Sequence, residues 1–547
     1  MTALKIRTFR QSVVLVAILL LGLALRLAPW GQNRFLEDEA LYATWGLQIV
    51  TGADPMLDNE PVDKPPLHAY TLALSFALFS SPLQAGGTEG GLETAARLPS
   101  LLASVASIAL VYALGRQLSP SPLGGRHRAG TAGAGGEGGE GGALLAALLL
   151  ALSPFDILFA STAFTDPLMT AWVLGALLAA ARGRLGAAGL LAGLAAATKQ
   201  QGLFFLPLVI AVGVLVGKSS HAARDLSVHA QAERSKPFGL AWLSQRRALV
   251  PQYVAWLRFF LSFSFVVAAV LGWDAARVQR PGFWEQGFIS YGGLGPAEPQ
   301  VLGQRAVEWL RLMGYFWGSP WFNGLLAAVL GIWLLGSGKL GDWGIGKLGL
   351  TLLIFVVGFL LLHWLVGFQV WDRYLLGLVP LLALLAGRAL TALGRAIGTA
   401  RWRKVYATAL PLALIVLLAG PVYRAARSGT PVGGDHGAYD GINGLAAYVR
   451  DHVPPDAVLY HHWLGYHYRF YLYGAPLRLH WYPDTDDLVH DATVYRREPR
   501  YIAFPSFRDG SAAQAAMAAA GITLAPVMET MRRDGTTSFR LYRLEGP

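Results

Sequence analysis

The sequence contains no cysteine, which excludes disulfides and thiolate-ligated metal sites. Charged residues are also scarce, at 14% of the chain, whereas an ordinary soluble domain carries about 25%. A nucleotide-binding phosphate loop is absent as well, because the glycines between Gly124 and Gly142 are irregularly spaced and lack a Gly-Lys-Ser/Thr ending. Hydrophobic residues make up 54% of the 547 positions instead. This balance is typical of a protein that spans a membrane.

Several apolar runs are long enough to cross a bilayer, which takes about 20 residues. They include residues 12–30, 143–160 and 348–368, and the mean hydropathy of the whole chain is +0.42. The first run lacks a small-residue cleavage site and is followed by further runs, so we interpret it as a retained helix rather than a signal peptide. The chain is therefore predicted to be a polytopic membrane protein.

The basic residues concentrate in alternate loops, as expected when positively charged loops stay in the cytoplasm. The stretch 67–79 decides the topology, because every later loop changes side if this stretch spans the membrane. Its 13 residues suit a helix lying along the interface better than a span. The net charge of +11 then reflects membrane orientation, and no nucleic-acid partner is predicted. The basic residues that this topology places inside include Arg126, Arg128, Arg182, Arg184 and the run 218–247.

The predicted fold is an all-α polytopic membrane protein with about eleven transmembrane helices and interfacial helices in the first loop. The predicted spans are 12–30, 98–117, 143–161, 167–181, 185–197, a sixth ending before 218, 257–273, 314–336, 348–368, 375–392 and 406–422. The helix 185–197 is rich in Ala and Gly, which permits close packing.

From about residue 426 the pattern changes, and strand-like segments at 457–460, 500–504 and 538–542 alternate with helical ones. We therefore expect two domains. Residues 1–425 form a transmembrane domain, and residues 426–547 form a small extracytoplasmic α/β domain.

Two dense polar patches follow the first span. One contains the adjacent acids Glu37, Asp38 and Glu39, and the other runs from Asp58 to Pro66. Acids in the first turn of a helix also occur where the helix start is merely solvated. Three adjacent carboxylates beside hydrocarbon are costly, however, and favour a functional interpretation. The two patches together predict the acidic floor of an active site at the membrane surface.

The predicted topology places further ionisable residues on the same extracytoplasmic face. Ionisable residues near the ends of spans usually face a cavity or a pathway. A carboxylate in such a place can take the proton from an acceptor hydroxyl, and Lys64, Lys199 and Arg373 can hold a departing phosphate. The complete set is Glu37, Asp38, Glu39, Asp63, Lys64, Asp166, Lys199, Asp274, Glu285, Asp372 and Arg373.

Simpler explanations stand beside these assignments. Asp166-Pro167 also suits the cap of a helix, because Asp is favoured at the N-cap and Pro at the first helical position. Lys199 also suits a lysine that extends from a helix end toward the lipid headgroups. Asp372 and Arg373 also suit a local ion pair. These alternatives remain open at the level of the sequence.

Three histidines in the tail, His461, His462 and His467, do not predict a metal site. No Cys or suitably spaced carboxylate accompanies them, so packing or surface positions are favoured. The aromatic residues around them offer a sugar-facing or lipid-facing patch instead. These residues are Tyr460, Trp463, Tyr466, Tyr468, Tyr471 and Tyr473.

Six short segments occur in order over about residues 10–395. They are Asp38-Glu39-Ala40-Leu41-Tyr42-Ala43, Asp63-Lys64-Pro65-Pro66-Leu67, Ala96-Arg97-Leu98-Pro99-Ser100, Thr165-Asp166-Pro167-Leu168, Thr198-Lys199-Gln200-Gln201-Gly202 and Arg373-Tyr374-Leu375-Leu376. In order and placement they resemble the GT-C glycosyltransferases of the protein O-mannosyltransferase and lipid A aminoarabinose transferase type, which are glycosyltransferase family 39-like. The resemblance does not extend to the tail.

The resemblance implies a polyprenyl-phosphate-linked sugar as donor and an active site on the extracytoplasmic face of the plasma membrane. It further implies that Asp38 is the catalytic carboxylate with Glu39 beside it, and that Asp166 is a second active-site acid. Glu37 is then expected to be a surface residue. Lys64 would contact the lipid phosphate. The residues expected to bind substrate are Asp63, Lys64, Lys199, Arg373 and Tyr374.

Some aminoarabinose transferases bind a divalent metal through an acid in the first loop and a His in the later long loop. Asp63 matches the acid, but residues 283–292 contain no His. This difference argues against a bound metal, and no other cofactor is predicted.

The sequence thus predicts an inverting glycosyltransferase in which Asp38 is the base and a glycan, lipid or protein is the acceptor. Membrane lipids are its other partners. One alternative is a transporter or lipid flippase with an acidic substrate site. Such folds often show repeated halves and helices broken at the midplane, whereas no internal repeat is evident here. A second alternative is a noncatalytic membrane protein whose tail binds a partner.

Overall fold

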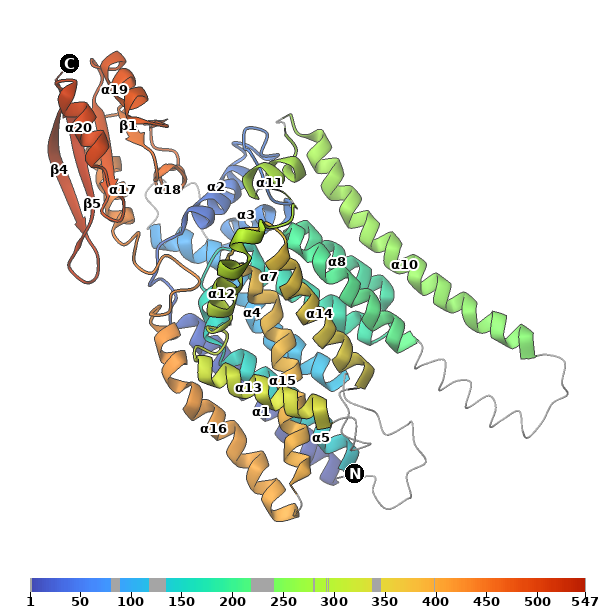
Figure 1. Cartoon of the computed structure of the whole chain (residues 1–547). Coiled ribbons are helices and arrows are strands. Elements are labelled where there is room, and N and C mark those ends of the chain that lie inside the picture. The colour runs from blue at the N-terminus through green and yellow to red at the C-terminus, as the bar shows by residue number, and fades with distance from the viewer. Residues whose placement is uncertain are drawn as a thin grey trace.

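The computed structural model describes residues 2–79, 89–117, 134–217, 241–278, 281–291, 293, 295–336, 346–397 and 399–546. Within these ranges a large bundle of helices carries a small sheet domain at one end, opposite the end where the N-terminus lies (Figure 1). The predicted cytoplasmic residues Arg126 and Arg128, and residues 218–240 of the basic run, lie outside the described residues.

The first half of the bundle alternates long helices with short ones. The short helices α2 and α3 lie in the loop between α1 and α4, as expected for the first loop. In chain order the elements are α1 (Thr2–Leu27), α2 (Glu37–Thr51), α3 (Leu67–Phe79), α4 (Glu89–Gln117), α5 (Ala134–Ala151), α6 (Pro154–Ala160), α7 (Thr165–Ala181), α8 (Leu185–Thr198) and the 3₁₀ helix η2 (Gln200–Phe205).

The second half completes the bundle and ends in the tail. Its elements are α10 (Ala241–Ala276), α11 (Phe283–Tyr291), η3 (Pro299–Val301), α12 (Leu302–Met313), α13 (Pro320–Gly336), α14 (Gly346–Leu365), η4 (Asp372–Leu378), α15 (Val379–Ala396) and α16 (Ala400–Ala426). A further helical stretch continues η2 as far as Gly217.

Among the described residues, seven helices are long and apolar enough to cross a membrane, and the bent pair α5–α6 makes an eighth. Each of the eleven predicted spans corresponds to one of these or to a shorter helix. The shorter ones are α7, α8 and α13, with 17, 14 and 17 residues. Helix α3, the predicted interfacial helix, has 13 residues and is about 20 Å long, which is less than the hydrocarbon thickness. The fold class is therefore confirmed, while fewer helices than predicted reach full spanning length.

The predicted span 143–161 is not one straight helix. It bends by 59° between α5 and α6, because Pro154 cannot donate to the preceding turn. The carbonyls of Leu150 and Ala151, near the end of α5, instead accept hydrogen bonds from the buried Arg26 of α1, at 3.2 Å each. Arg26 also pairs with Asp156 at 2.8 Å. A break inside an apolar bundle is stable only when polar groups of this kind are satisfied.

Helices α8 and α10 pack unusually closely, as the Ala/Gly-rich sequence of α8 predicts. A Cβ atom on Gly189 would lie 2.1 Å from the backbone oxygen of Phe259 and 2.6 Å from Ser262 Oγ. Ser262 Oγ also donates to the Gly186 oxygen at 2.7 Å. In Figure 1, α10 lies on the outside of the bundle against α8. From Tyr253 to Ala276, most of its apolar side chains are exposed, as is usual for side chains that face lipid.

The tail forms a five-stranded mixed sheet with flanking helices. The strand order is β2-β1-β3-β5-β4, in which β1 pairs in parallel with β2 and β3, and β5 pairs antiparallel with β3 and β4. The predicted strand segments are confirmed. The elements are α17 (Ile442–His452), β1 (Val458–His461), α18 (Gly465–Tyr471), β2 (Arg478–Trp481), α19 (Thr485–Val494), β3 (Arg500–Pro505), α20 (Ser511–Ala519), β4 (Thr523–Met531) and β5 (Thr537–Glu545).

Helix α18 lies between the sheet and the bundle, next to α2 (Figure 1). This contact places a segment of the tail beside the first loop, where the acidic patches lie. The division into domains at residues 425 and 426 remains a prediction, although α16 ends at Ala426.

Candidate active site

The three adjacent acids open helix α2, and they point to three different partners. Successive residues of an α-helix are separated by about 100°, so neighbouring side chains diverge. Glu37 accepts a hydrogen bond from the Tyr439 hydroxyl. Asp38 pairs with Arg373, whose Nη2 lies 2.9 Å from Asp38 Oδ2. Glu39 turns into the protein. Of the three, Asp38 is the one held against a cation while its side chain stays 31% exposed.

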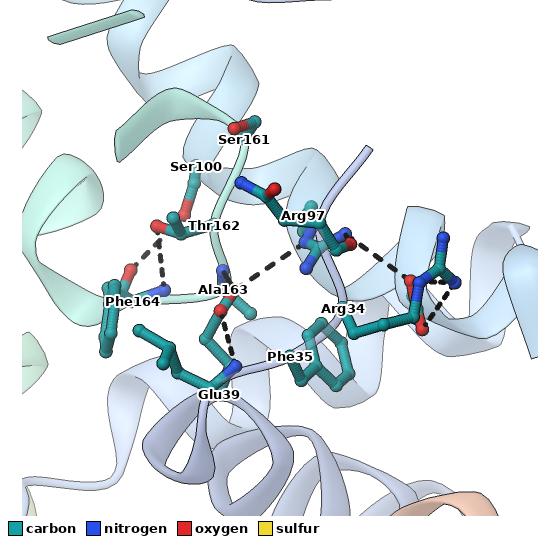
Figure 2. A network of polar contacts seen from close by, with 12 residues as sticks. Arg34, Phe35, Glu39, Arg97, Ser100, Ser161, Thr162, Ala163 and Phe164 are labelled. Atoms are coloured by element: carbon teal, nitrogen blue, oxygen red, sulfur yellow. Dashed lines mark hydrogen bonds and ion pairs between the residues drawn. The ribbon is translucent and has the colours of Figure 1, made fainter. Parts of the chain in front are cut away.

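Glu39 fixes the start of α2 to two other elements (Figure 2). Its Oε2 accepts from the Leu36 N–H at 3.0 Å, and its Oε1 accepts from the Ala163 N–H at 2.7 Å. Arg97 of α4 lies 3.6 Å from Oε1. Glu39 is fully buried, and burial raises its pKa, while Arg97 and the two backbone hydrogen bonds act in the opposite direction. These contacts fix the position of the segment that carries Asp38.

Arg373 is buried at the start of η4 and lies near two aromatic rings. Its guanidinium carbon lies 4.7 Å from the Trp371 ring centre and 5.1 Å from that of Phe164. The neighbouring Asp372 does not pair with the Arg373 side chain. It accepts from the Arg373 N–H at 2.7 Å and from the Gly433 N–H at 3.0 Å. The structure therefore favours an ion pair between Arg373 and Asp38 over a local pair with Asp372.

The second polar patch brings Asp63 and Lys64 to the same region. Lys64 Nζ lies 2.8 Å from Asp63 Oδ2 and donates a hydrogen bond to the Tyr291 hydroxyl of α11. Both residues are buried, and Gln200 Nε2 donates to the Asp63 backbone oxygen at 2.7 Å. Burial lowers the pKa of Lys64, and the charge of Asp63 opposes this effect.

Asp166 and Lys199 form a third, deeper pair. Lys199 Nζ lies 2.5 Å from Asp166 Oδ1 and 4.7 Å from the Tyr374 ring centre. Asp166 is fully buried in the first turn of α7, where the Thr165 hydroxyl also donates to it at 3.2 Å. The pair joins the end of α8 to the start of α7.

Two adjoining cavities lie among these residues, and both are lined by Tyr291 and Arg373. The larger cavity, about 440 Å³, is lined mainly by polar and aromatic side chains. Its walls are Leu36, Glu37, Asp38, Leu41, Pro61, Asp63, Phe164, Gln286, Ser290, Tyr291, Gln369, Trp371, Arg373 and Tyr466.

The smaller cavity, about 130 Å³, combines cations with aromatic and apolar side chains. Its walls are Lys64, Lys199, Gln200, Gln201, Leu203, Phe204, Trp284, Gly287, Phe288, Tyr291, Gly293, His363, Phe368, Arg373 and Tyr374. Asp38 and Asp63 thus line the larger cavity, whereas Lys64 and Lys199 line the smaller one.

Six of the eight predicted site residues line these cavities. Asp38 and Asp63 line the larger one, Lys64, Lys199 and Tyr374 line the smaller one, and Arg373 lines both. Glu39 and Asp166 line neither cavity, because their carboxylates are buried against Arg97 and Lys199.

Sequence reasoning found Tyr374 but missed several other aromatic and amide residues of the walls. Tyr291, Trp284 and Phe288 come from α11, whose aromatic-rich sequence was the available signal. Gln286 and Gln369 carried no signal, because single amides in loops and short helices are common. Tyr466 belonged to the aromatic patch of the tail, but nothing in the sequence placed that patch against Asp38.

The residues around Asp63 do not fit a metal site. The carboxylate of Asp63 is paired with Lys64, and the described part of the chain contains no group of three or more potential ligands of the His, Cys, Asp or Glu type.

No family model matches the chain, and no curated protein matches it. A solved structure does: ArnT from Cupriavidus metallidurans, bound to undecaprenyl phosphate, with a TM-score of 0.56 and 16% sequence identity over 97% of each chain. The chain has the fold of ArnT. This likeness confirms, for the fold, the resemblance to GT-C glycosyltransferases of the lipid A aminoarabinose transferase type.

The likeness to ArnT also covers more of the chain than the sequence motifs do. The motifs end near residue 395, whereas 97% of the chain matches, so most of the C-terminal sheet domain takes part in the likeness. Together with the apolar helices, it identifies the chain as a multi-pass membrane protein.

Proposed function

We propose that the chain is a membrane glycosyltransferase that moves a sugar from a polyprenyl-phosphate-linked donor to an acceptor hydroxyl. The observation that carries this proposal is the pair of adjoining cavities around Arg373 and Tyr291. One offers cations and aromatic side chains, which suit a phosphate on an apolar chain. The other offers carboxylates, amides and aromatic side chains, which suit a sugar.

The donor phosphate would lie in the smaller cavity, between Lys64, Lys199 and Arg373. Charge-assisted hydrogen bonds from such groups stabilise the negative charge that develops on a leaving phosphate. Trp284 and Phe288 of α11 line the same cavity and are 46% and 36% exposed. Their exposed apolar faces would direct the first isoprene units of the donor outward into the membrane. The undecaprenyl phosphate bound to ArnT supports this class of donor.

The sugar would lie in the larger cavity, beside Asp38. The Asp38 carboxylate takes the proton of the acceptor hydroxyl, and the hydroxyl oxygen forms a bond to the anomeric carbon. The bond between that carbon and the phosphate oxygen breaks, and polyprenyl phosphate leaves with its electron pair. A single displacement of this kind inverts the anomeric configuration.

Glu39 and Asp166 serve as positioning residues in this proposal. Glu39 holds the start of α2 and thus the place of Asp38, and Asp166 holds the ammonium of Lys199 toward the smaller cavity. Arg373 links the two cavities, because it pairs with Asp38 and would also contact the phosphate.

The active site and the tail would face the extracytoplasmic side of the plasma membrane. The charge distribution supports this orientation, because the basic N-terminus lies at the opposite end of the bundle from the sheet domain (Figure 1). Helices α2 and α11, which carry Asp38 and Tyr291, lie at the sheet end of the bundle (Figure 1). This arrangement favours a surface reaction over the transporter alternative.

Donor use is expected to weaken as the pH rises through the lowered pKa of Lys64. A lysine with a lowered pKa loses its charge at a lower pH than an exposed lysine, and the phosphate then loses one cationic partner. The measurement is kcat/KM for the donor between neutral and alkaline pH, because this ratio reports groups of the free enzyme. Lys64→Arg keeps its charge throughout and should show a smaller decline. A part of the decline should remain, because burial also lowers the pKa of Lys199 in the same cavity, to about 8. The same pH profile in both proteins would exclude Lys64 as the responsible group.

The proposed function is tested by a panel of labelled donors. The purified protein in lipid vesicles is given polyprenyl-phosphate sugars and nucleotide sugars, and the release of polyprenyl phosphate and the transfer of label are both measured. We expect turnover of at least one polyprenyl-phosphate sugar and none of the nucleotide sugars. Movement of an intact lipid-linked sugar from one leaflet of the vesicle membrane to the other, without release of polyprenyl phosphate, would support the flippase alternative instead.

A further inference from the structure

The tail contributes directly to the wall of the larger cavity. Tyr466, in the first turn of α18, lines this cavity together with Asp38 and Asp63 and does not line the smaller one. The residue is 41% exposed. Partial burial and the charges of Asp38 and Asp63 raise the pKa of its hydroxyl, which keeps it protonated as a hydrogen-bond donor. A residue more than 400 positions away in the sequence thus lines the same cavity as the proposed base.

The rest of α18 is fastened to the segment that precedes Asp38. His467 lies 2.8 Å from the Phe35 backbone oxygen, and the Phe35 N–H donates to the Tyr471 hydroxyl at 3.4 Å. The Tyr471 hydroxyl donates in turn to Glu93 at 2.5 Å. These contacts involve buried residues, so the position of α18 is set relative to the start of α2.

Further contacts hold the neighbouring side chains. The Tyr439 ring stacks on His467 at 4.0 Å, and its hydroxyl donates to Glu37, which also lines the larger cavity. Arg469 of α18 donates to Glu60 at 2.9 Å, next to Pro61 of the cavity wall. The tail therefore holds Glu37 as well as presenting Tyr466.

In an inverting displacement, the position of the leaving phosphate determines the side from which the acceptor approaches. The acceptor hydroxyl must approach the anomeric carbon from the face opposite the leaving phosphate. Lys64 and Lys199, which mark the phosphate, line only the smaller cavity. Glu37 and Tyr466 line only the larger one, so they lie on the side of the site away from the phosphate.

We propose, on the basis of the function proposed above, that Glu37 and Tyr466 form a carbohydrate acceptor subsite supplied in part by the C-terminal sheet domain. A sugar ring offers C–H groups that pack on an aromatic face and hydroxyl groups that bond to a carboxylate. Tyr466 supplies both a ring and a hydroxyl, which is why Tyr and Trp are favoured where one side of a contact is apolar and the other polar. The amides of Gln286 and Gln369 complete a wall suited to hydroxyl groups.

The test compares Tyr466→Ala and Tyr466→Phe with the wild-type protein. Purified oligosaccharides, glycolipids carrying the same sugars and a serine-rich peptide are offered as acceptors, and acceptor KM, donor KM and direct oligosaccharide binding are measured. Tyr466→Ala should raise acceptor KM about tenfold and leave donor KM unchanged, since one aromatic contact is lost. Tyr466→Phe keeps the ring, so its acceptor KM should lie between those of the wild-type protein and Tyr466→Ala. Comparing the soluble and lipid-linked forms of one sugar distinguishes a free glycan from a glycolipid headgroup.

Trp481→Ala is the matched control, because Trp481 is an exposed aromatic residue of β2 that lines neither cavity. It should leave acceptor KM unchanged, and the unfolding temperatures should show that all variants are folded. An increase in donor KM instead of acceptor KM in Tyr466→Ala would overturn the assignment, as would use of the peptide alone.

Different results would contradict the transferase proposal and the acceptor-subsite proposal. Oligosaccharide binding that depends on Tyr466, without turnover of any polyprenyl-phosphate sugar, would support the subsite and contradict the transferase. Turnover with an acceptor KM that Tyr466→Ala does not alter would support the transferase and contradict the subsite.

Discussion

Replacing Asp38 by asparagine is expected to lower the rate of sugar transfer by about 10²- to 10⁴-fold, the usual contribution of a general base. Asparagine has nearly the same shape, but it cannot take the proton of the acceptor hydroxyl. Donor KM should change much less than kcat, because the lysines and Arg373 of the smaller cavity remain in place. The measurement is steady-state transfer of labelled sugar at saturating donor.

Two further variants distinguish the loss of a catalytic base from effects on the surrounding structure or on the surface charge. Asp451→Asn changes an exposed acid of the tail and should leave the rate unchanged. Glu39→Gln removes a buried charge next to Arg97 and should lower the unfolding temperature, because Arg97 then loses one of its partners. An Asp38→Asn variant as active as the wild type would rule out Asp38 as the base.

Replacing Arg373 by glutamine is expected to lower kcat/KM for the donor by about 10- to 150-fold. A hydrogen bond to a charged group contributes roughly 1.5–3 kcal/mol, and this variant removes such a contact to the phosphate. Asp38 also loses its cationic partner at 2.9 Å, so both cavities are affected by one change. The measurement is donor titration with polyprenyl-phosphate sugar at a fixed acceptor concentration.

Arg373→Lys keeps the charge without the planar guanidinium, and it should recover only part of the loss. Arg478→Gln is the matched control, because Arg478 forms an exposed ion pair with Glu498 on the sheet domain, where such pairs contribute little. A donor kcat/KM that is unchanged in Arg373→Gln would place the phosphate elsewhere.

The sequence predicted the elements of this fold well because apolar length and alternation are local properties. The bend between α5 and α6 was not predicted, although Pro154 lies at the break. The carbonyls at the break are satisfied by Arg26, which comes from α1, and this contact depends on the tertiary fold. The C-terminal strands were visible as short alternating runs, but their contact with the first loop depends on tertiary packing around Phe35 and His467.

The sequence predicted the site residues best where a charged side chain lies near the end of a span and needs a partner of opposite charge. Asp38, Lys64, Lys199 and Arg373 stood out for this reason, and the structure brings them together around two cavities. Residue type alone does not distinguish an acid that faces a cavity from one that is buried in a hydrogen-bond network. Glu39 was therefore grouped with Asp38, although the helix turns its side chain toward Ala163 and Arg97.

The wall residues could not be predicted in the same way. Tyr466 and Tyr291 lie in different parts of the chain and become neighbours of Asp38 only through the packing of α18 and α11. Aromatic residues are common in membrane proteins, so their positions carry little information until the fold is known.

The most direct test of the two-cavity account is a structure of the Asp38→Asn variant with a polyprenyl-phosphate sugar bound. We expect the phosphate within hydrogen-bonding distance of Lys64 and Arg373, the lipid tail leaving past Trp284 and Phe288, and the sugar in the larger cavity. A phosphate in the larger cavity, or a donor bound between other helices, would contradict the account.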